Sequence, residues 1–224
     1  MLTVPGLCWL CRMPLMLSHW GICSGCARAM QMQEKVCPLC GLPAGHENVP
    51  CGRCLQKPQP WQRLIAVGDY APPLSTLVQQ FKFHPRPELA NALARLLLLR
   101  VIQSGKRPVP DLLLSVPLHA RRQWRRGFNQ SDLLCRPLAR WLPCRYSCTA
   151  LKRLRATTIQ HHLSARLRRQ NLKNAFHLEL PIAGLHIVLV DDVVTTGSTV
   201  AEISRLLLRS GAATVQVWCL CRTL

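Results

Sequence analysis

The chain has 224 residues, 49% of them hydrophobic, so we expect a folded globular protein with one full core and a smaller appended unit rather than a disordered chain. Lysine and arginine number 29 against 10 acidic residues, which gives a net charge of +19. This excess predicts attraction to nucleic acid, phosphorylated metabolites or anionic lipid, although a scattered basic surface would have the same composition.

The sequence offers no good candidate for a membrane span. Its most apolar helical stretch, residues 93–102, is short and is interrupted by Arg95 and Arg100, whereas a span needs roughly 20 apolar residues. The first residues lack a basic segment followed by an apolar one, so we expect no signal peptide. Together these features predict a cytoplasmic protein.

The first 54 residues contain eight of the thirteen cysteines, arranged as four C-x-x-C pairs. In a cytoplasmic chain such an array predicts metal sites rather than disulfides, and redox activity of the pairs is the weaker alternative. Two pairs complete a closed tetrahedral zinc site, so four pairs predict two structural zinc ions in a double zinc ribbon. The spacing leaves open which pairs share an ion, and neighbouring pairs are the simpler arrangement. The proposed ligands are Cys8, Cys11, Cys23, Cys26, Cys37, Cys40, Cys51 and Cys54.

Proline-containing residues 57–62 are expected to link the zinc ribbon, residues 1–56, to a second domain over residues 63–224. Alternation of strands with helices in that domain predicts a mostly parallel sheet flanked by helices, an α/β fold. Pro137 should kink its helix or begin a new segment. The expected strands cover residues 63–70, 110–118, 186–193 and 214–221, and the expected helices cover 73–83, 87–104, 129–142 and 199–211.

The stretch "VLVDDVVTTGST" joins a buried strand to a helix through a loop of hydroxyl residues and one glycine. Backbone N–H groups at a helix N-terminus bind anions, so the loop is a candidate phosphate cradle. Asp191 and Asp192 would repel a phosphate, but they could accept hydrogen bonds from sugar hydroxyls or hold Mg²⁺. A Walker-B-like strand end and a helix-capping aspartate are the alternatives. The chain contains no G-x-x-x-x-G-K-[ST] motif, so a monophosphate fits better than a triphosphate.

This motif resembles the phosphoribosyl-pyrophosphate (PRPP) motif of type I phosphoribosyltransferases. The resemblance implies that Asp191 and Asp192 contact the ribose, together with Mg²⁺, and that the following loop binds the 5-phosphate. The implied phosphate ligands are Thr195, Thr196, Gly197, Ser198 and Thr199.

The order of the zinc module and of "FKFHPRPELA", "SVPLHARRQWRRGFNQSDLL", "TTIQHHLSARLRRQNLKNAF" and the PRPP motif resembles the ComF/GntX family, nearest to its enteric-bacterial branch. That family implies a role in competence, DNA uptake or use of DNA as a nutrient. It also implies that Gln160 and Arg166 lie in a mobile loop that closes over PRPP. The implied pyrophosphate ligands are Val116, Pro117, Leu118, His119, Arg121 and Arg122.

Basic residues are concentrated in one part of the chain, since residues 119–173 hold 14 lysines or arginines and a single acid. Trp124 and Trp141 lie among them and could stack on unpaired bases, but we expect both to be core residues. Three hypotheses follow. The first is a phosphoribosyltransferase with an unidentified nitrogen acceptor. The second is a single-stranded-DNA-binding factor with a sensory or vestigial PRPP site, and the third is a scaffold for other DNA-uptake proteins.

Overall fold

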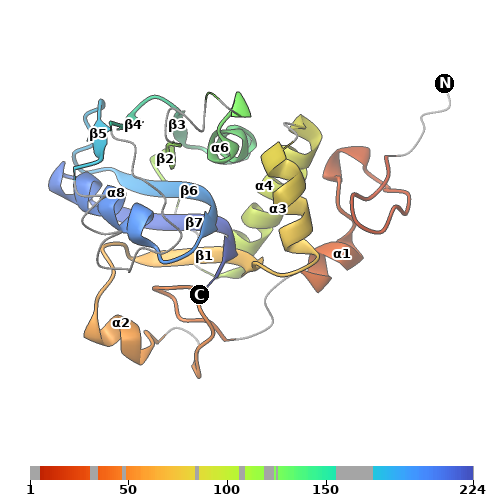
Figure 1. Cartoon of the computed structure of the whole chain (residues 1–224), viewed down its shortest axis with the longest axis horizontal. Coiled ribbons are helices and arrows are strands. Elements are labelled where there is room, and N and C mark those ends of the chain that lie inside the picture. The colour runs from red at the N-terminus through yellow and green to blue at the C-terminus, as the bar shows by residue number, and fades with distance from the viewer. Residues whose placement is uncertain are drawn as a thin grey trace.

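The computed structural model describes residues 6–30, 35–46, 49–83, 86–105, 109–118, 124, 126–154 and 174–223 (Figure 1). A five-stranded sheet in the order β1-β7-β6-β2-β3 forms its centre, and every neighbouring pair is parallel. The strands are β1 (Arg63–Asp69), β2 (Leu112–Ser115), β3 (Arg145–Ser147), β6 (His186–Val194) and β7 (Thr214–Arg222). The sheet therefore has the parallel topology that alternating strands and helices predict.

Helices cover both faces of this sheet. Alternate residues of a strand point to opposite faces, so Val188 and Val190 of β6 join one core cluster while Ile187 and Leu189 join the other. The first cluster lies under α3, α4 and α6, and the second lies under α8 and the antiparallel pair of β4 and β5. These elements are α3 (Leu74–Phe83), α4 (Pro87–Gln103), α6 (Gln130–Trp141), α8 (Ser198–Arg209), β4 (Leu151–Arg153) and β5 (Phe176–Leu178).

Two cysteine-rich units pack against different parts of this domain (Figure 1). The first cysteine unit, residues 6–30, contains η1 (Ser18–Trp20) and α1 (Ser24–Ala29) and joins the core cluster under α4. There Arg95 donates to the carbonyl of Ile22 at 2.5 Å and stacks over the ring of Trp20. The second cysteine unit, residues 35–46 and 49–56, contains α2 (Gly52–Gln56) and lies beside β1.

The structure corrects two expectations from the sequence. Trp124 and Trp141 are not core residues, because 89% and 45% of their surfaces are exposed. Trp141 is the last residue of α6, and the arginine-rich stretch around Trp124 offers few apolar side chains to cover it. Of the two alternatives expected at Pro137, the structure excludes a new segment, because α6 continues through this buried residue.

Cys219 and Cys221 are fully buried in β7. Within the described residues, no helix combines the length and the apolar character that crossing a membrane requires.

Candidate functional site

The two adjacent aspartates lie near the carboxyl end of β6, beside the end of β2. Ligands of open parallel sheets bind at this edge, where loops leave the strands. Asp191 is half-buried, and its Oδ1 accepts hydrogen bonds from Ser131 Oγ at 3.2 Å and from the N–H of Asp192 at 2.9 Å. Burial raises the pKa of the Asp191 carboxyl well above its ordinary value, and repulsion from the Asp192 carboxylate raises that pKa further.

The second carboxylate has a cation beside it. Lys82 Nζ, at the end of α3, lies 3.4 Å from Asp192 Oδ2, and the N–H of Val193 donates to Asp192 Oδ1 at 2.7 Å. Lys82 also lies over the ring of Tyr70. Within the described residues, the two acids are partly shielded from solvent and Lys82 is the cation that forms an ion pair with them. A divalent cation with oxygen ligands would balance the remaining carboxylate charge, so the donor set fits Mg²⁺.

The loop after β6 has the conformation that the hydroxyl-and-glycine pattern favours. Gly197 precedes α8 and has a left-handed backbone (φ 74°), which glycine adopts without strain. Thr196 Oγ1 and Ser198 Oγ lie 2.9 Å apart, and Thr196 Oγ1 also accepts from the N–H of Ser198 at 3.4 Å. The first N–H groups of α8 have no carbonyl partner within the helix, so this end of α8 can accept an anion.

The loop after β2 approaches the same edge of the sheet. The N–H of Val116 donates to the carbonyl of Val190 at 3.0 Å, and Asn129 Nδ2 donates to the carbonyl of Val116 at the same distance. Val116 therefore lies beside the residue that precedes Asp191, and Pro117 and Leu118 follow it in the chain. Of the other implied ligands, His119, Arg121, Arg122, Gln160 and Arg166 lie outside the described residues.

The sequence patterns did not identify two residues that lie at the carboxyl end of β6. Lys82 lies within the "FKFHPRPELA" stretch, and Ser131 follows the helix-capping Asn129. Lys82 lies on α3 and Ser131 on α6, far in sequence from the aspartates of β6. Only the folded structure therefore identifies each as a partner of an aspartate. A lone basic residue at the end of α3 was the only available signal for Lys82.

The eight cysteines of the C-x-x-C pairs form two separate tetrads, each from neighbouring pairs. The sulfur atoms of each tetrad all lie within 4.8 Å of one another. Cys11 Sγ and Cys23 Sγ are 3.8 Å apart, as are Cys40 Sγ and Cys51 Sγ. Tetrahedral zinc with arms of about 2.3 Å has sulfur–sulfur edges of about 3.8 Å. Each tetrad could therefore bind a structural zinc ion, and the simpler pairing is the one observed.

Backbone donors prepare one thiol of each tetrad for metal binding. Burial opposes ionisation of Cys8, but backbone N–H groups, chiefly that of Cys23, outweigh it and lower the pKa of this thiol to about 6. Burial likewise opposes ionisation of Cys37, and the N–H of Cys51 leads the donors that lower its pKa to about 7. Zinc binds thiolates, so these donors favour the protonation state that the metal requires.

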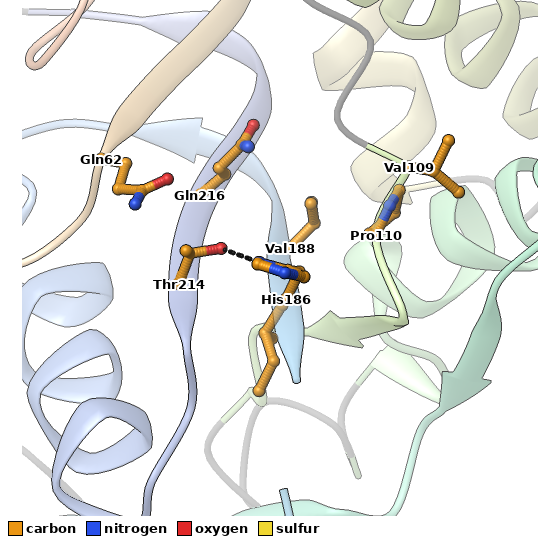
Figure 2. A pocket seen from close by; sticks show the side chains of 8 residues that line it. Gln62, Val109, Pro110, His186, Val188, Thr214 and Gln216 are labelled. Carbon is orange, nitrogen blue, oxygen red and sulfur yellow. Dashed lines mark hydrogen bonds between the residues drawn. The ribbon is translucent and has the colours of Figure 1, made fainter. Parts of the chain in front are cut away.

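A pocket of about 270 Å³ lies at the amino ends of the strands, where β6 and β7 begin (Figure 2). His186 Nδ1 and Thr214 Oγ1 are 2.9 Å apart in its wall, and the amides of Gln62 and Gln216 also line it. This pocket is separate from the aspartate pair, because the amino ends of parallel strands lie away from their carboxyl ends.

Comparison with known proteins assigns the fold and the relatives. The phosphoribosyl transferase domain family matches residues 134–224. The chain is 70% identical over 227 residues to the DNA utilization protein YhgH of Salmonella typhi, with both chains fully covered. It is 42% identical to competence protein F of Haemophilus influenzae, with 96% of each chain covered. It is 27% identical to competence protein ComFC of Bacillus subtilis, over 90% of this chain and 84% of that one. The domain has the type I phosphoribosyltransferase fold.

Proposed function

The chain belongs to the ComF family of competence and DNA-utilisation proteins, and on that premise we propose that it binds PRPP or a related 5-phosphorylated ribose while acting in the uptake or utilisation of DNA. The observation that carries this proposal is the distribution of charge at the carboxyl end of β6. Two hydrogen-bonded carboxylates, Asp191 and Asp192, are followed directly by an anion-accepting loop over residues 195–199.

The two halves of this site suit different ends of a ribose 5-phosphate. The carboxylates accept hydrogen bonds from the vicinal ribose hydroxyls, which are donors. The hydroxyls of Thr195, Thr196, Ser198 and Thr199 and the N–H groups at the start of α8 donate to the 5-phosphate. Gly197 supplies the left-handed backbone (φ 74°) that leads the loop into the first N–H groups of α8.

Residues of the β2 loop and the arginines after it are proposed to receive the diphosphate of PRPP. Arginine donors pair with diphosphate oxygens through two parallel N–H groups. Mg²⁺ held at the carboxylate pair would offset the charge of the diphosphate. We also assign Lys82 the task of compensating Asp192 before the ligand binds, since Lys82 Nζ is the cation closest to that carboxylate among the described ion pairs.

Equilibrium calorimetry tests this function with PRPP and Mg²⁺. We expect saturable binding by the wild-type chain and loss of binding when Asp191 and Asp192 are both changed to Asn. Ribose without a phosphate serves as the ligand control, because it lacks the group that the loop receives. If ribose and ribose 5-phosphate bound with equal affinity, the assignment of residues 195–199 as the phosphate site would be rejected.

Transfer of the phosphoribosyl group to a nitrogen nucleophile is a second candidate, favoured by the domain match over residues 134–224. In that reaction the nucleophile forms a bond to C1 of the ribose while the bond from C1 to the diphosphate breaks. Release of pyrophosphate from PRPP with a panel of bases, ammonia and amines tests it. Release that needs both an acceptor and the two aspartates supports transfer, and no release with any acceptor rejects it.

Binding of single-stranded DNA is a third candidate, and the exposed tryptophans favour it. Trp141 is followed by exposed Arg145 and preceded by exposed Arg136 and Arg140 on α6. Aromatic rings beside cations form stacking platforms for unpaired bases along a phosphate backbone. Such binding weakens steeply as salt rises, whereas a flat salt response would reject it.

A further inference from the structure

The second cysteine unit contacts the loop that is proposed to bind the phosphate, and a buried arginine makes the connection. Arg222, at the end of β7, donates from Nε to the carbonyl of Cys40 at 2.7 Å. Its Nη1 donates to the carbonyl of Val194 at 3.0 Å and also to those of Thr195 and Thr223. One guanidinium therefore joins a metal-site turn to the last residue of β6 and to the first residue of the phosphate loop, which we define as residues 195–199.

Trp61 makes a second connection between the same two segments. Its Nε1 donates to the carbonyl of Leu39, in the turn between Cys37 and Cys40, at 2.6 Å. The far edge of its ring, at Cη2, would lie 3.3 Å from a Cβ added to Gly197. Trp61 is buried, and its ring lies between the cysteine turn and Gly197, the residue that precedes α8.

The cysteine turn, residues 37–41, also bonds to β1, which is the edge strand of the sheet. The N–H of Leu64 in β1 donates to the carbonyl of Pro38 at 2.9 Å. Gly41 has a left-handed backbone (φ 68°), and a Cβ there would come within 2.5 Å of Leu64 Cδ2. Residues 37–41 thus pack directly on β1 without room for a larger side chain at Gly41.

The chemistry of Arg222 argues for a positioning task. Only 7% of its surface is exposed, and within the described residues it donates to four backbone carbonyls, those of Cys40, Val194, Thr195 and Thr223. Burying a guanidinium is costly unless its donors are used, so the arrangement holds only while both segments present their carbonyls. The planar fork of arginine can hold several carbonyls in a fixed relation, which lysine cannot do.

We propose that Arg222 and Trp61 are positioning residues that hold the phosphate loop on the second cysteine unit, so that phosphate affinity depends on the second tetrad being intact. The inference rests on the proposed function, because it assigns the loop as the phosphate site. Among the described residues, no side-chain hydrogen bond joins the first cysteine unit to the phosphate loop; that unit is held on α4 by Arg95. We therefore assign support of the phosphate loop to the second tetrad and not to the first.

Arg95 provides a matched control. It is a half-buried arginine that donates to a backbone carbonyl of a cysteine unit, as Arg222 does, but it lies on α4. The test compares Arg222→Gln, Trp61→Phe and Arg95→Gln in the full chain, with zinc content measured in each. We expect ribose 5-phosphate to bind about tenfold more weakly to the first two, from loss of a charge-assisted or buried hydrogen bond, and within about twofold of wild type to the third.

Hydrogen exchange separates positioning from general damage. Amides of residues 195–199 should exchange faster in Arg222→Gln and Trp61→Phe, while those inside β6 and β7 keep their protection. If Arg222→Gln loses protection throughout the sheet, Trp61→Phe, the smaller change, decides the result. In Arg95→Gln the loop amides should exchange as in wild type.

Changes at the metal sites complete the test. Cys51→Ser, in the second tetrad, should weaken ribose 5-phosphate binding, and Cys23→Ser, in the first, should not. Linkage is reciprocal, so ribose 5-phosphate should also increase zinc retained by the second tetrad against a chelator. Wild-type affinity and loop exchange in both Arg222→Gln and Trp61→Phe would overturn the inference and leave the proposed function standing. No binding by the wild-type chain would overturn the proposed function and, with it, the inference.

Discussion

Lys82 Nζ lies 3.4 Å from Asp192 Oδ2 and joins the end of α3 to the end of β6. Both side chains are largely shielded, with 22% and 16% of their surfaces exposed, so their attraction is less screened than that of a surface pair. Lys82→Gln should lower the free energy of unfolding by about 0.5–1 kcal/mol at neutral pH, measured by urea denaturation.

A second lysine supplies the control for this change. Lys152 pairs with Glu179 at 2.6 Å, but 55% and 39% of those side chains are exposed. Lys152→Gln should cost about 0.3 kcal/mol or less, despite the shorter distance. A larger loss from Lys152→Gln than from Lys82→Gln would contradict the view that shielding gives the Lys82 pair its value.

The raised pKa of Asp191 predicts a variant that is more stable than wild type. Folding disfavours the ionised form of this carboxyl, so its charge costs stability at neutral pH. Asp191→Asn removes the charge and can keep the acceptor for Ser131. Its thermal midpoint should exceed that of wild type at neutral pH, and the difference should vanish below about pH 4, where the wild-type carboxyl is protonated in both states.

Asp69, exposed at the end of β1, is the control position for this pH series. Asp69→Asn should leave the thermal midpoint close to that of wild type at neutral pH. An Asp191→Asn chain that is less stable than wild type at neutral pH would show that the charge of Asp191 is compensated in the fold.

The cysteine tetrads predict two zinc ions per chain. Elemental analysis of the purified protein should find about two equivalents, and Cys11→Ser should reduce this to about one, because three thiolates hold zinc less tightly than four. Cys148→Ser is the control, since Cys148 is exposed and outside both tetrads. Two equivalents of zinc in Cys11→Ser would argue against a four-cysteine first site.

Exposure of Trp141 predicts a contribution to binding of single-stranded DNA. Trp141→Ala should weaken binding of an oligothymidine by about 1–3 kcal/mol, the range for one stacked base. Fluorescence anisotropy at two salt concentrations measures this loss and the salt slope together. Leu180→Ala removes a similarly exposed apolar side chain outside α6 and should change neither value. Equal losses in the two variants would remove Trp141 from the interface.

Local patterns in the sequence predicted most of the fold. The strand expected over residues 186–193 ends one residue later, and the helix expected over 199–211 covers Ser198–Arg209. Hydrophobic periodicity and glycine positions act locally, so they survive in a single sequence. The pairing of neighbouring C-x-x-C motifs is equally local, because short loops connect them.

Contacts between distant residues were beyond such patterns. Arg222 and Cys40 are 182 positions apart, and no local sequence motif relates one to the other. The prediction that Trp124 and Trp141 are core residues was wrong for a related reason. Burial of a side chain depends on residues from other parts of the chain that pack on it, and a local pattern does not contain them. The aspartate pair was recognisable from sequence, whereas the lysine, arginine and tryptophan that support its surroundings required the fold.

The most direct test of the account is calorimetric titration of PRPP with Mg²⁺ into the wild-type chain and into the Asp191→Asn, Asp192→Asn double variant. We expect saturable binding by wild type and at least about tenfold weaker binding by the variant, since each lost carboxylate removes charge-assisted hydrogen bonds. Circular dichroism and zinc content should match between the two proteins. Equal affinity in both, or no binding to the zinc-loaded wild-type chain, would contradict a phosphoribose site at the end of β6.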